Sequence, residues 1–343
     1  MIHSFILLSL VVVASMIPCS RVWFAPRLLT DSILVGGGKF FDYQHTTQLR
    51  GIAILMILVG HISGAFHTVV LSPLASAGVT IFMILSGYGL QCSFVKNGLK
   101  HFWSKKYLRV MLPYTIVITI WLLVHEEFEV TRYLYEITGI KTTYWYVDYQ
   151  IKWYVVFFFT LLLIPNYSLA AFTLATLAMF VLLHSLAAEQ SFAFLIGVII
   201  ARHREKLQDL SRRKWLCIAC ISVIVAFSAL AFKQLPEVRA YLGTKFYSSI
   251  QLIINLGLGL AIISLSTIIS SIRSSFLLLI SGYVSFEIYL LHFPFYGRLN
   301  NRIELAILLI IGSIVASYLF MKLTGSMSAR ISKFNKLSWR RNM

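Results

Sequence analysis

Charged side chains are scarce in this chain. They make up 13% of its 343 residues, about half of the roughly 25% that is usual in soluble proteins. Hydrophobic residues account for 58%, and the mean hydropathy is +0.80. This balance excludes an ordinary soluble enzyme and leaves no room for a separate soluble catalytic domain. It predicts an all-α, polytopic membrane helical bundle.

Cysteine is also rare, with four residues in the whole chain. Cys217 and Cys220 have the C-x-x-C spacing, but they lie in an apolar run without a second pair or a nearby histidine. That context favours small buried hydrophobic residues over a metal or redox site. We therefore expect no metal centre.

Acidic residues are the scarcest charged type, since 13 Asp and Glu stand against 30 Lys and Arg, for a net charge of +17. In a soluble protein this excess would suggest a nucleic-acid partner. Here 22 of the 30 basic residues fall on one side of the predicted bundle, as the positive-inside rule expects of the cytoplasmic side. We therefore expect membrane lipids around the chain, no nucleic acid, and an N-terminus outside.

Long apolar runs predict about 10–11 transmembrane helices. The first run is followed by Arg21 and Arg27 and has no basic leader, so we interpret it as a true span and not as a cleaved signal peptide. The run 190–202 is short for a span. The eleven runs are 4–19, 51–69, 73–95, 110–126, 149–166, 168–187, 190–202, 215–232, 249–269, 276–296 and 303–323.

Arg50 and His61 flank an apolar stretch of ten residues. On a helix they would lie about 16 Å apart along the axis, which is roughly half of a ~30 Å hydrocarbon core. The predicted topology places Arg50 at the cytoplasmic surface and His61 near the bilayer midplane. Ionisable residues at that depth are costly and usually functional.

Five segments follow one another in a recognisable order. They are Leu49-Arg50-Gly51-Ile52-Ala53 with Gly60-His61, then Phe82 to Tyr88 with Ser86-Gly87, then Lys105-Lys106-Tyr107-Leu108-Arg109 with Pro113, then Trp153-Tyr154 ahead of Pro165, and finally Ser285 to Pro294 with Tyr289 and His292. In this order the chain resembles the acyltransferase-3 family of integral-membrane O-acyltransferases. One position departs from the pattern, because many glycan O-acetyltransferases of the family carry a glutamate where this chain has Gln150, and Asp148 lies two residues early.

The resemblance implies an enzyme that moves an acyl group, most simply acetyl, from cytoplasmic acyl-CoA to a hydroxyl of a cell-envelope saccharide such as exopolysaccharide, capsule or O-antigen. It implies no permanently bound cofactor, an inner-membrane location and envelope-polysaccharide assembly proteins as partners. Residues 1–45 would form an added N-terminal transmembrane helix with a cytoplasmic linker, 46–325 the acyltransferase core and 326–343 a basic cytoplasmic tail.

Acyl transfer to a hydroxyl needs a base, and His61 is the candidate because a neutral imidazole accepts a proton near neutral pH. Basic side chains at the cytoplasmic face suit the phosphates of coenzyme A, although topology anchoring explains them equally well. Ser86 and Gly87 would let the CoA arm or a neighbouring helix approach closely. The expected donor-binding residues are Arg50, Ser86, Gly87, Lys105, Lys106 and Arg109.

The acceptor side is less defined. Glu287 is a carboxylate in an apolar span that would orient a histidine or bind acceptor hydroxyls. The aromatic run from Trp145 to Tyr154 suits either a membrane-interface anchor or sugar rings, and we interpret His184 as a surface polar residue. The expected substrate-binding residues are Trp153, Tyr154, Glu287, Tyr289 and His292.

Two other functions fit the same sequence. A glycan or lipid transporter would also use broken helices and buried ionisable groups, although the two halves show no obvious repeat. A non-enzymatic envelope-assembly protein of the same fold is the second alternative, which the Gln150 departure favours.

Overall fold

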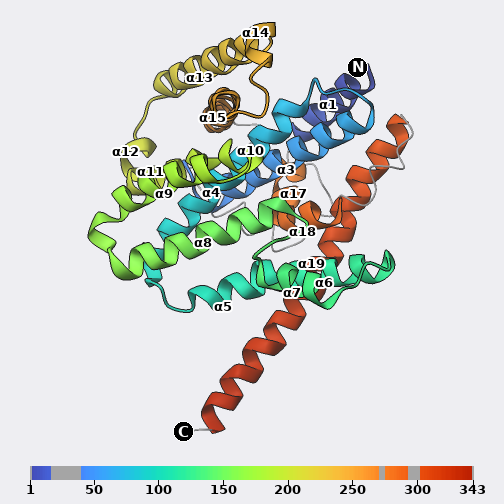
Figure 1. Cartoon of the computed structure of the whole chain (residues 1–343), viewed down its shortest axis with the longest axis vertical. Helices are drawn as coiled ribbons and strands as arrows, with labels where there is room; N and C mark the ends of the chain where they lie inside the picture. The colour runs from blue at the N-terminus through green and yellow to red at the C-terminus, as the bar shows by residue number, and fades with distance from the viewer. Residues whose placement is uncertain (1, 17–39, 270–274, 293–301, 342–343) are drawn as a thin grey trace.

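The computed structural model describes residues 2–16, 40–269, 275–292 and 302–341, with side chains as far as Ser328. This part of the chain is a bundle of α-helices (Figure 1). The longer helices are α1 (Ile2–Ser15), α3 (Tyr43–Ala65), α4 (Ser72–Asn97), α6 (Leu112–Val124), α8 (Trp145–Leu163), α9 (Ser168–Leu182), α11 (Ser191–Arg202), α13 (Arg212–Lys233), α15 (Lys245–Ile268) and α19 (Ile303–Arg341).

Short helical segments connect or extend these helices. They are α5 (Phe102–Lys106), the π-helical turn η2 (Tyr107–Met111), α7 (Val130–Thr138), the 3-10 turn η3 (Pro165–Tyr167), α10 (Ser185–Ala188), α12 (Arg204–Gln208), α14 (Pro236–Arg239), α17 (Phe276–Tyr283) and α18 (Ser285–Leu291).

The predicted polytopic helical bundle is confirmed. Eight helical segments of the described residues are long and apolar enough to cross a membrane. Three predicted spans correspond to helices outside that count. They are α1, with 14 residues, α8, which carries the Asp148–Lys152 ion pair, and α17 with α18, which are separated at Val284.

Two predicted boundaries are wrong. The span expected to begin at 51 begins at Tyr43, because the Asp42 side chain accepts the His45 N–H and caps the helix. Polar residues from His45 to Gln48 lie in this first part and are buried, so their polarity hides a helix start inside the bundle. The span expected from 110 begins at Phe102, through α5 and η2.

Helix α4 lies at the centre of the bundle and packs against α3, α11 and α15. Gly87 of α4 and Gly197 of α11 allow the backbones of these two helices to approach each other closely. A Cβ at Gly87 would lie 2.2 Å from the Phe194 carbonyl oxygen, and one at Gly197 would lie 2.0 Å from that of Ile84. Small residues at such crossings are typical of membrane helix packing.

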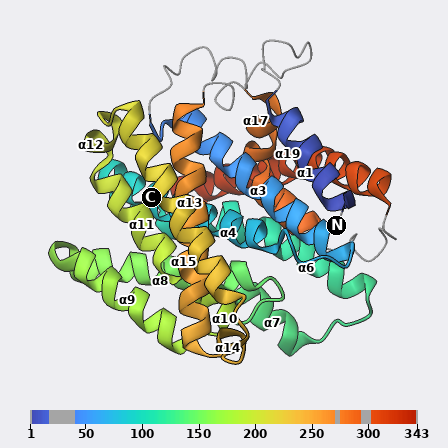
Figure 2. The ribbon, with the colours of Figure 1, turned by 90° about the horizontal axis from the view of Figure 1, so that it is seen from above.

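The peripheral helices surround this centre. Helices α13 and α15 form one edge, α6 and α7 lie on the opposite edge, and the C-terminal half of α19 extends beyond the other helices (Figure 1). Seen from above, α1 and α19 lie on the opposite side from α9 (Figure 2). Cys217 and Cys220 are exposed on α13, so the expectation that they are buried was wrong, because this helix lies at the periphery.

The two ends of the bundle are named here by their residues. The basic end is where α3 begins and α4 ends, and it includes α5 and α12. The His61 end is where α3 ends and α4 begins. The predicted tail from 326 belongs to the same helix as the span before it, since α19 continues to Arg341, and the division into three regions stays a prediction.

Candidate active site

Four basic side chains expected to bind the donor come together in the structure. Lys106 lies within electrostatic range of Arg50, Lys105 and Arg109, and Arg50 lies within range of Arg109. Arg50 comes from α3, whereas the other three come from α5 and η2. These four residues are called the cation cluster.

The local backbone around the cluster is a π-helical turn from Tyr107 to Met111, in which the Leu112 N–H bonds to the Tyr107 carbonyl. Pro113 follows and has no N–H for the Arg109 carbonyl, so the regular α-helical ladder is interrupted here. Lys106 is half-buried, whereas Lys105 and Arg109 are exposed. Single π-helical turns inside α-helices are frequent at functional sites.

The cation cluster has no carboxylate at ion-pair distance among the described residues. The two ion pairs in that part of the chain are Arg132–Glu127 and Lys152–Asp148. Lys106 instead lies over aromatic rings, with its Nζ 4.7 Å from the Tyr154 centroid. A pocket adjoins the cluster, lined by Leu90, Ser93, Phe94, Gly98, Lys100, Phe102, Lys105, Lys106 and Phe157. Four neighbouring cations without a counterion form a site suited to a polyanion.

A hydrogen-bonded row leads away from the cluster through the bundle. The Gln150 amide donates to Ser86 Oγ at 2.6 Å, and the Tyr146 hydroxyl donates to Gln150 Oε1 at 3.0 Å. Arg50 lies within electrostatic range of both Tyr146 and Tyr154, which flank Gln150 on α8. Ser86 therefore lies in the row, while the neighbouring Gly87 serves the contact between α4 and α11, and the donor-binding role of Ser86 stays a prediction.

His61 and His292 form a pair at the end of this path. The atoms His61 Nδ1 and His292 Nε2 are 3.2 Å apart, and the two rings stack with centroids 5.4 Å apart and an interplanar angle of 20°. His292 is buried, with 1% of its surface exposed, whereas His61 is exposed. The two histidines are 231 positions apart in the sequence, and the packing of α18 against α3 brings them together.

The hydrogen bonds assign a tautomer to the pair. His292 Nδ1 lies 3.0 Å from the Ile288 carbonyl oxygen, and a carbonyl only accepts, so we infer a proton on that nitrogen. In the neutral pair, His292 Nε2 then accepts the proton of His61 Nδ1. His61 Nε2 consequently carries the lone pair that a general base needs.

Tyr289 lies beside the pair, and Glu287 does not. The Tyr289 ring centroid is 5.8 Å from that of His292 and 5.3 Å from that of Tyr146, which joins the hydrogen-bonded row to the histidines. Glu287 is half-buried, and in the described part of the chain it makes no side-chain hydrogen bond or ion pair to either histidine. Glu287 is five positions before His292, and residues of a helix share a face at spacings of three and four.

Residues 47–322 match the acyltransferase domain of the acyltransferase-3 family. The chain belongs to the acyltransferase-3 family. No curated protein and no solved structure matches it. The match covers most of the chain, so the chain is a multi-pass membrane acyltransferase.

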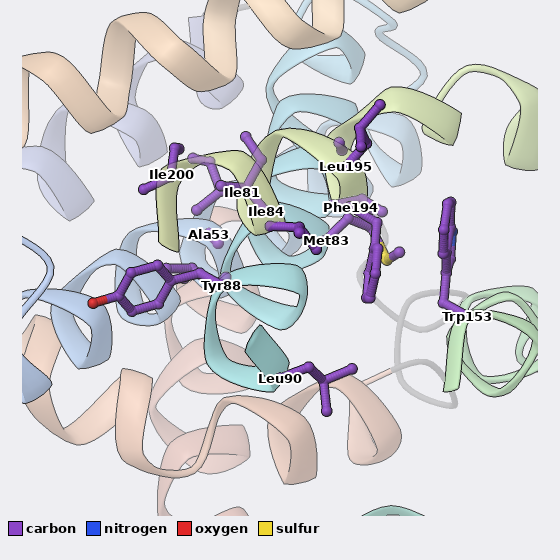
Figure 3. Packing of buried hydrophobic residues seen from close by; sticks show 14 of the residues in the cluster. Ala53, Ile81, Met83, Ile84, Tyr88, Leu90, Trp153, Phe194, Leu195 and Ile200 are labelled. Atoms are coloured by element: carbon purple, nitrogen blue, oxygen red, sulfur yellow. The ribbon is translucent and has the colours of Figure 1, made fainter. Parts of the chain in front are cut away.

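The two aromatic residues expected to bind the acceptor lie elsewhere in the acyltransferase. Trp153 is fully buried, and its ring stacks on Phe194 at 4.3 Å and 13° (Figure 3). Tyr154 lies against Lys106, next to the cation cluster. The structure therefore places Trp153 in the core and Tyr154 beside the cation cluster, and neither has a ring contact with the histidine pair among the described residues.

Because α3 begins at Tyr43 and not at residue 51, Arg50 and His61 lie farther from the start of the helix than the sequence predicted. Arg50 lies about 10 Å into the helix from Tyr43, and His61 lies about 27 Å from that start. His61 is therefore about 6 Å from the helix end at Ala65. Arg50 therefore lies two turns inside α3 and His61 lies just over one turn from its other end, while their depths in the membrane stay predictions.

The sequence interpretation missed a support for His292 that begins at Glu136 in α7 and continues through the loop after it. Glu136 is buried and accepts hydrogen bonds from the Thr143 N–H, at 3.0 and 2.9 Å, and from the Tyr114 hydroxyl. The Tyr144 hydroxyl donates to the Leu290 carbonyl at 2.8 Å, two residues before His292.

The hydroxyl of this support stays protonated over any working pH range. Burial, and then the Glu136 carboxylate, raise the pKa of Tyr144 to about 12. The only sequence signal for this support was a single acidic residue, Glu136, in the polar segment that forms α7.

Proposed function

We propose that this acyltransferase moves an acetyl group from acetyl-CoA, bound at the basic end, to a hydroxyl of a cell-envelope saccharide at the His61 end. The observation that carries the proposal is one continuous path. It runs from cations that have no counterion among the described residues, through the row Ser86–Gln150–Tyr146 and the ring contacts of Tyr289, to a histidine whose Nε2 holds a lone pair.

The donor suits the cation cluster by its charge. Acyl-CoA carries several phosphate groups at one end and its thioester at the end of a long flexible arm. Arg50 offers bidentate contacts to phosphate, and Lys105, Lys106 and Arg109 offer point charges or further bidentate contacts. With the phosphates at the cluster, the arm would follow the row toward His61, about 16 Å from Arg50 along α3.

The chemical step uses His61 as the general base. Its Nε2 takes the proton of an acceptor hydroxyl while the hydroxyl oxygen bonds to the thioester carbonyl carbon. When this intermediate collapses, the C–S bond breaks and the leaving thiolate takes the proton back from Nε2. The products are the acyl ester and the CoA thiol, and His61 returns to its neutral form. His292 accepts the Nδ1–H throughout and holds the ring in place.

A saccharide suits the acceptor side because the His61 end is rich in tyrosine and tryptophan rings, which stack on sugar rings and bond their hydroxyls. An inner-membrane location would give the basic end access to cytosolic acyl-CoA. Partners would be envelope-polysaccharide assembly proteins, and no permanently bound cofactor is required by the step.

The test uses the purified full-length chain in lipid nanodiscs, radiolabelled acetyl-CoA, and envelope glycan from the native cells after mild base has removed its esters. Wild-type protein is expected to transfer label to the glycan. His61→Ala and Arg50→Ala should abolish transfer, whereas His67→Ala, at an exposed position six residues beyond His61, should not. Undiminished transfer by His61→Ala would refute the mechanism.

A further inference from the structure

The two aromatic residues expected to bind the acceptor do not lie at the histidine pair, since Trp153 lies in the core and Tyr154 lies beside Lys106. Another tryptophan, Trp145, begins α8 at the His61 end and is half-buried. Its ring contacts Tyr146, with centroids 6.2 Å apart at 87°. Tyr146 in turn contacts Tyr289, which contacts His292. Trp145 is therefore joined to the histidine pair by successive ring contacts.

The geometry of these contacts leaves the indole suited to a flat ligand. Trp145 meets Tyr146 and His184 edge-to-face and Tyr149 at a tilt. Among the described residues, none of its ring contacts is a stacked one. By contrast, Trp153 is stacked on Phe194.

Two polar side chains that could bond sugar hydroxyls lie near the Trp145 ring. The His184 ring is exposed and lies 6.3 Å from that of Trp145. Asp148 lies three residues along α8, on a neighbouring part of the same face, and its side chain is 18% exposed. An indole in ring contact with an imidazole, with a Lys152-paired carboxylate one turn along the same helix, offers stacking together with hydrogen-bond donors and acceptors for hydroxyls.

We propose that Trp145, His184 and Asp148 form the acceptor platform, on which a saccharide ring stacks before one of its hydroxyls reaches His61. The proposal rests on the proposed function and adds a site to it. A membrane anchor would use the same tryptophan at the interface, but it would not need the chain of ring contacts to the histidine pair.

The test measures acceptor and donor kinetics separately, with the full-length chain in nanodiscs, labelled acetyl-CoA and base-treated envelope glycan. Trp145→Ala should raise the apparent KM for glycan about tenfold, which corresponds to about 1.4 kcal/mol. The KM for acetyl-CoA should stay within twofold. Trp145→Phe keeps an aromatic face and should recover most of the acceptor affinity, while Asp148→Asn should raise the glycan KM alone.

The matched control is Trp121→Ala. Trp121 is also a half-buried tryptophan, in the last turn of α6, with His125 stacked on it at 4.5 Å. It should leave both KM values unchanged. Equal loss in Trp121→Ala and Trp145→Ala, a parallel rise of both KM values, or an unchanged glycan KM in Trp145→Ala overturns the platform. Absence of transfer by the wild-type protein would instead contradict the proposed function, which separates the two failures.

Discussion

At the residue scale, the two histidines have different duties because their hydrogen bonds differ. His292 is held by the Ile288 carbonyl and accepts from His61, whereas in the proposed mechanism His61 presents Nε2 to the acceptor hydroxyl. The bond between the rings strengthens when His61 becomes charged, since hydrogen bonds to charged groups contribute about 1.5–3 kcal/mol.

We therefore expect His292→Ala to lower kcat by about 10- to 100-fold, and His61→Ala to lower it further, by about 10²- to 10⁴-fold. Steady-state kinetics with saturating acetyl-CoA measures both. Because His292 acts through His61, the double variant should be no slower than His61→Ala alone. Losses that multiply in the double variant would show that the two rings act independently.

Gln150 stands where many relatives have a carboxylate, and its amide is used at both ends. It donates to Ser86 and accepts from Tyr146, a combination that a carboxylate cannot make without reversing the Ser86 bond. Gln150→Glu would also place a negative charge among residues close to Arg50. We expect the variant to raise the KM for acetyl-CoA, because the new carboxylate competes with the donor phosphates for the cation. An unchanged donor KM would argue against Arg50 as a phosphate ligand.

At the scale of single helices, the contact of α4 with α11 sets the position of Ser86 in the row. A Cβ at Gly87 would lie 2.2 Å from the Phe194 carbonyl oxygen, so Gly87→Ala must push the helices apart. Overpacking of this kind costs about 1–3 kcal/mol. We expect a lower thermal midpoint in detergent for Gly87→Ala.

The control is on the same helix. Gly89→Ala places its Cβ in open space, with nothing within 4 Å, and alanine favours helix over glycine. It should leave the midpoint unchanged or slightly raise it. A Gly89→Ala variant as unstable as Gly87→Ala would mean that α4 tolerates no substitution here, whatever its contacts.

The helices themselves could be predicted from apolar runs, because a membrane span must satisfy its backbone within the segment. Prediction from apolar runs failed where polar residues are buried inside the bundle. The start of α3 is polar yet buried against other helices, so its first two turns looked like a loop. The interruption between α17 and α18 at Val284 lies beside Ser281, Gly282 and Ser285, but α4 carries Ser86-Gly87 without a break, so such residues alone did not predict it.

The site was predictable only in part, for the same reason. His61 could be selected because an ionisable group in an apolar run is costly, whereas Arg50 and Lys106 could be selected because they lie in basic segments of the predicted cytoplasmic side that resemble the family's. The partner of His61 depends on how α18 packs against α3, which no local spacing encodes. Trp145 and Trp153 have the same chemistry and differ only in what covers them, and the stacking of Trp153 on Phe194 comes from a distant helix.

At the scale of the whole molecule, the cation cluster lies apart from His61, the candidate general base. The cation cluster lies toward one end of the bundle and His61 near the other, so donor and acceptor would approach from opposite sides of the membrane. Under the proposed function, such an arrangement would move an acyl group across the bilayer without moving coenzyme A. It also makes activity depend on which face meets the donor.

We therefore expect sidedness in proteoliposomes. With a protease-cleavable tag after Met343 reporting the orientation, acetyl-CoA supplied to the basic end should support acylation of glycan on the other side, and acetyl-CoA supplied only to the His61 end should not. Coenzyme A should be released on the basic side. Raising the salt concentration should weaken the donor dependence, since exposed charges such as Lys105 and Arg109 are screened over about 10 Å at 0.1 M. Equal activity with donor on either side would contradict the separation of the two sites, because the cations would then play no part in admitting the donor.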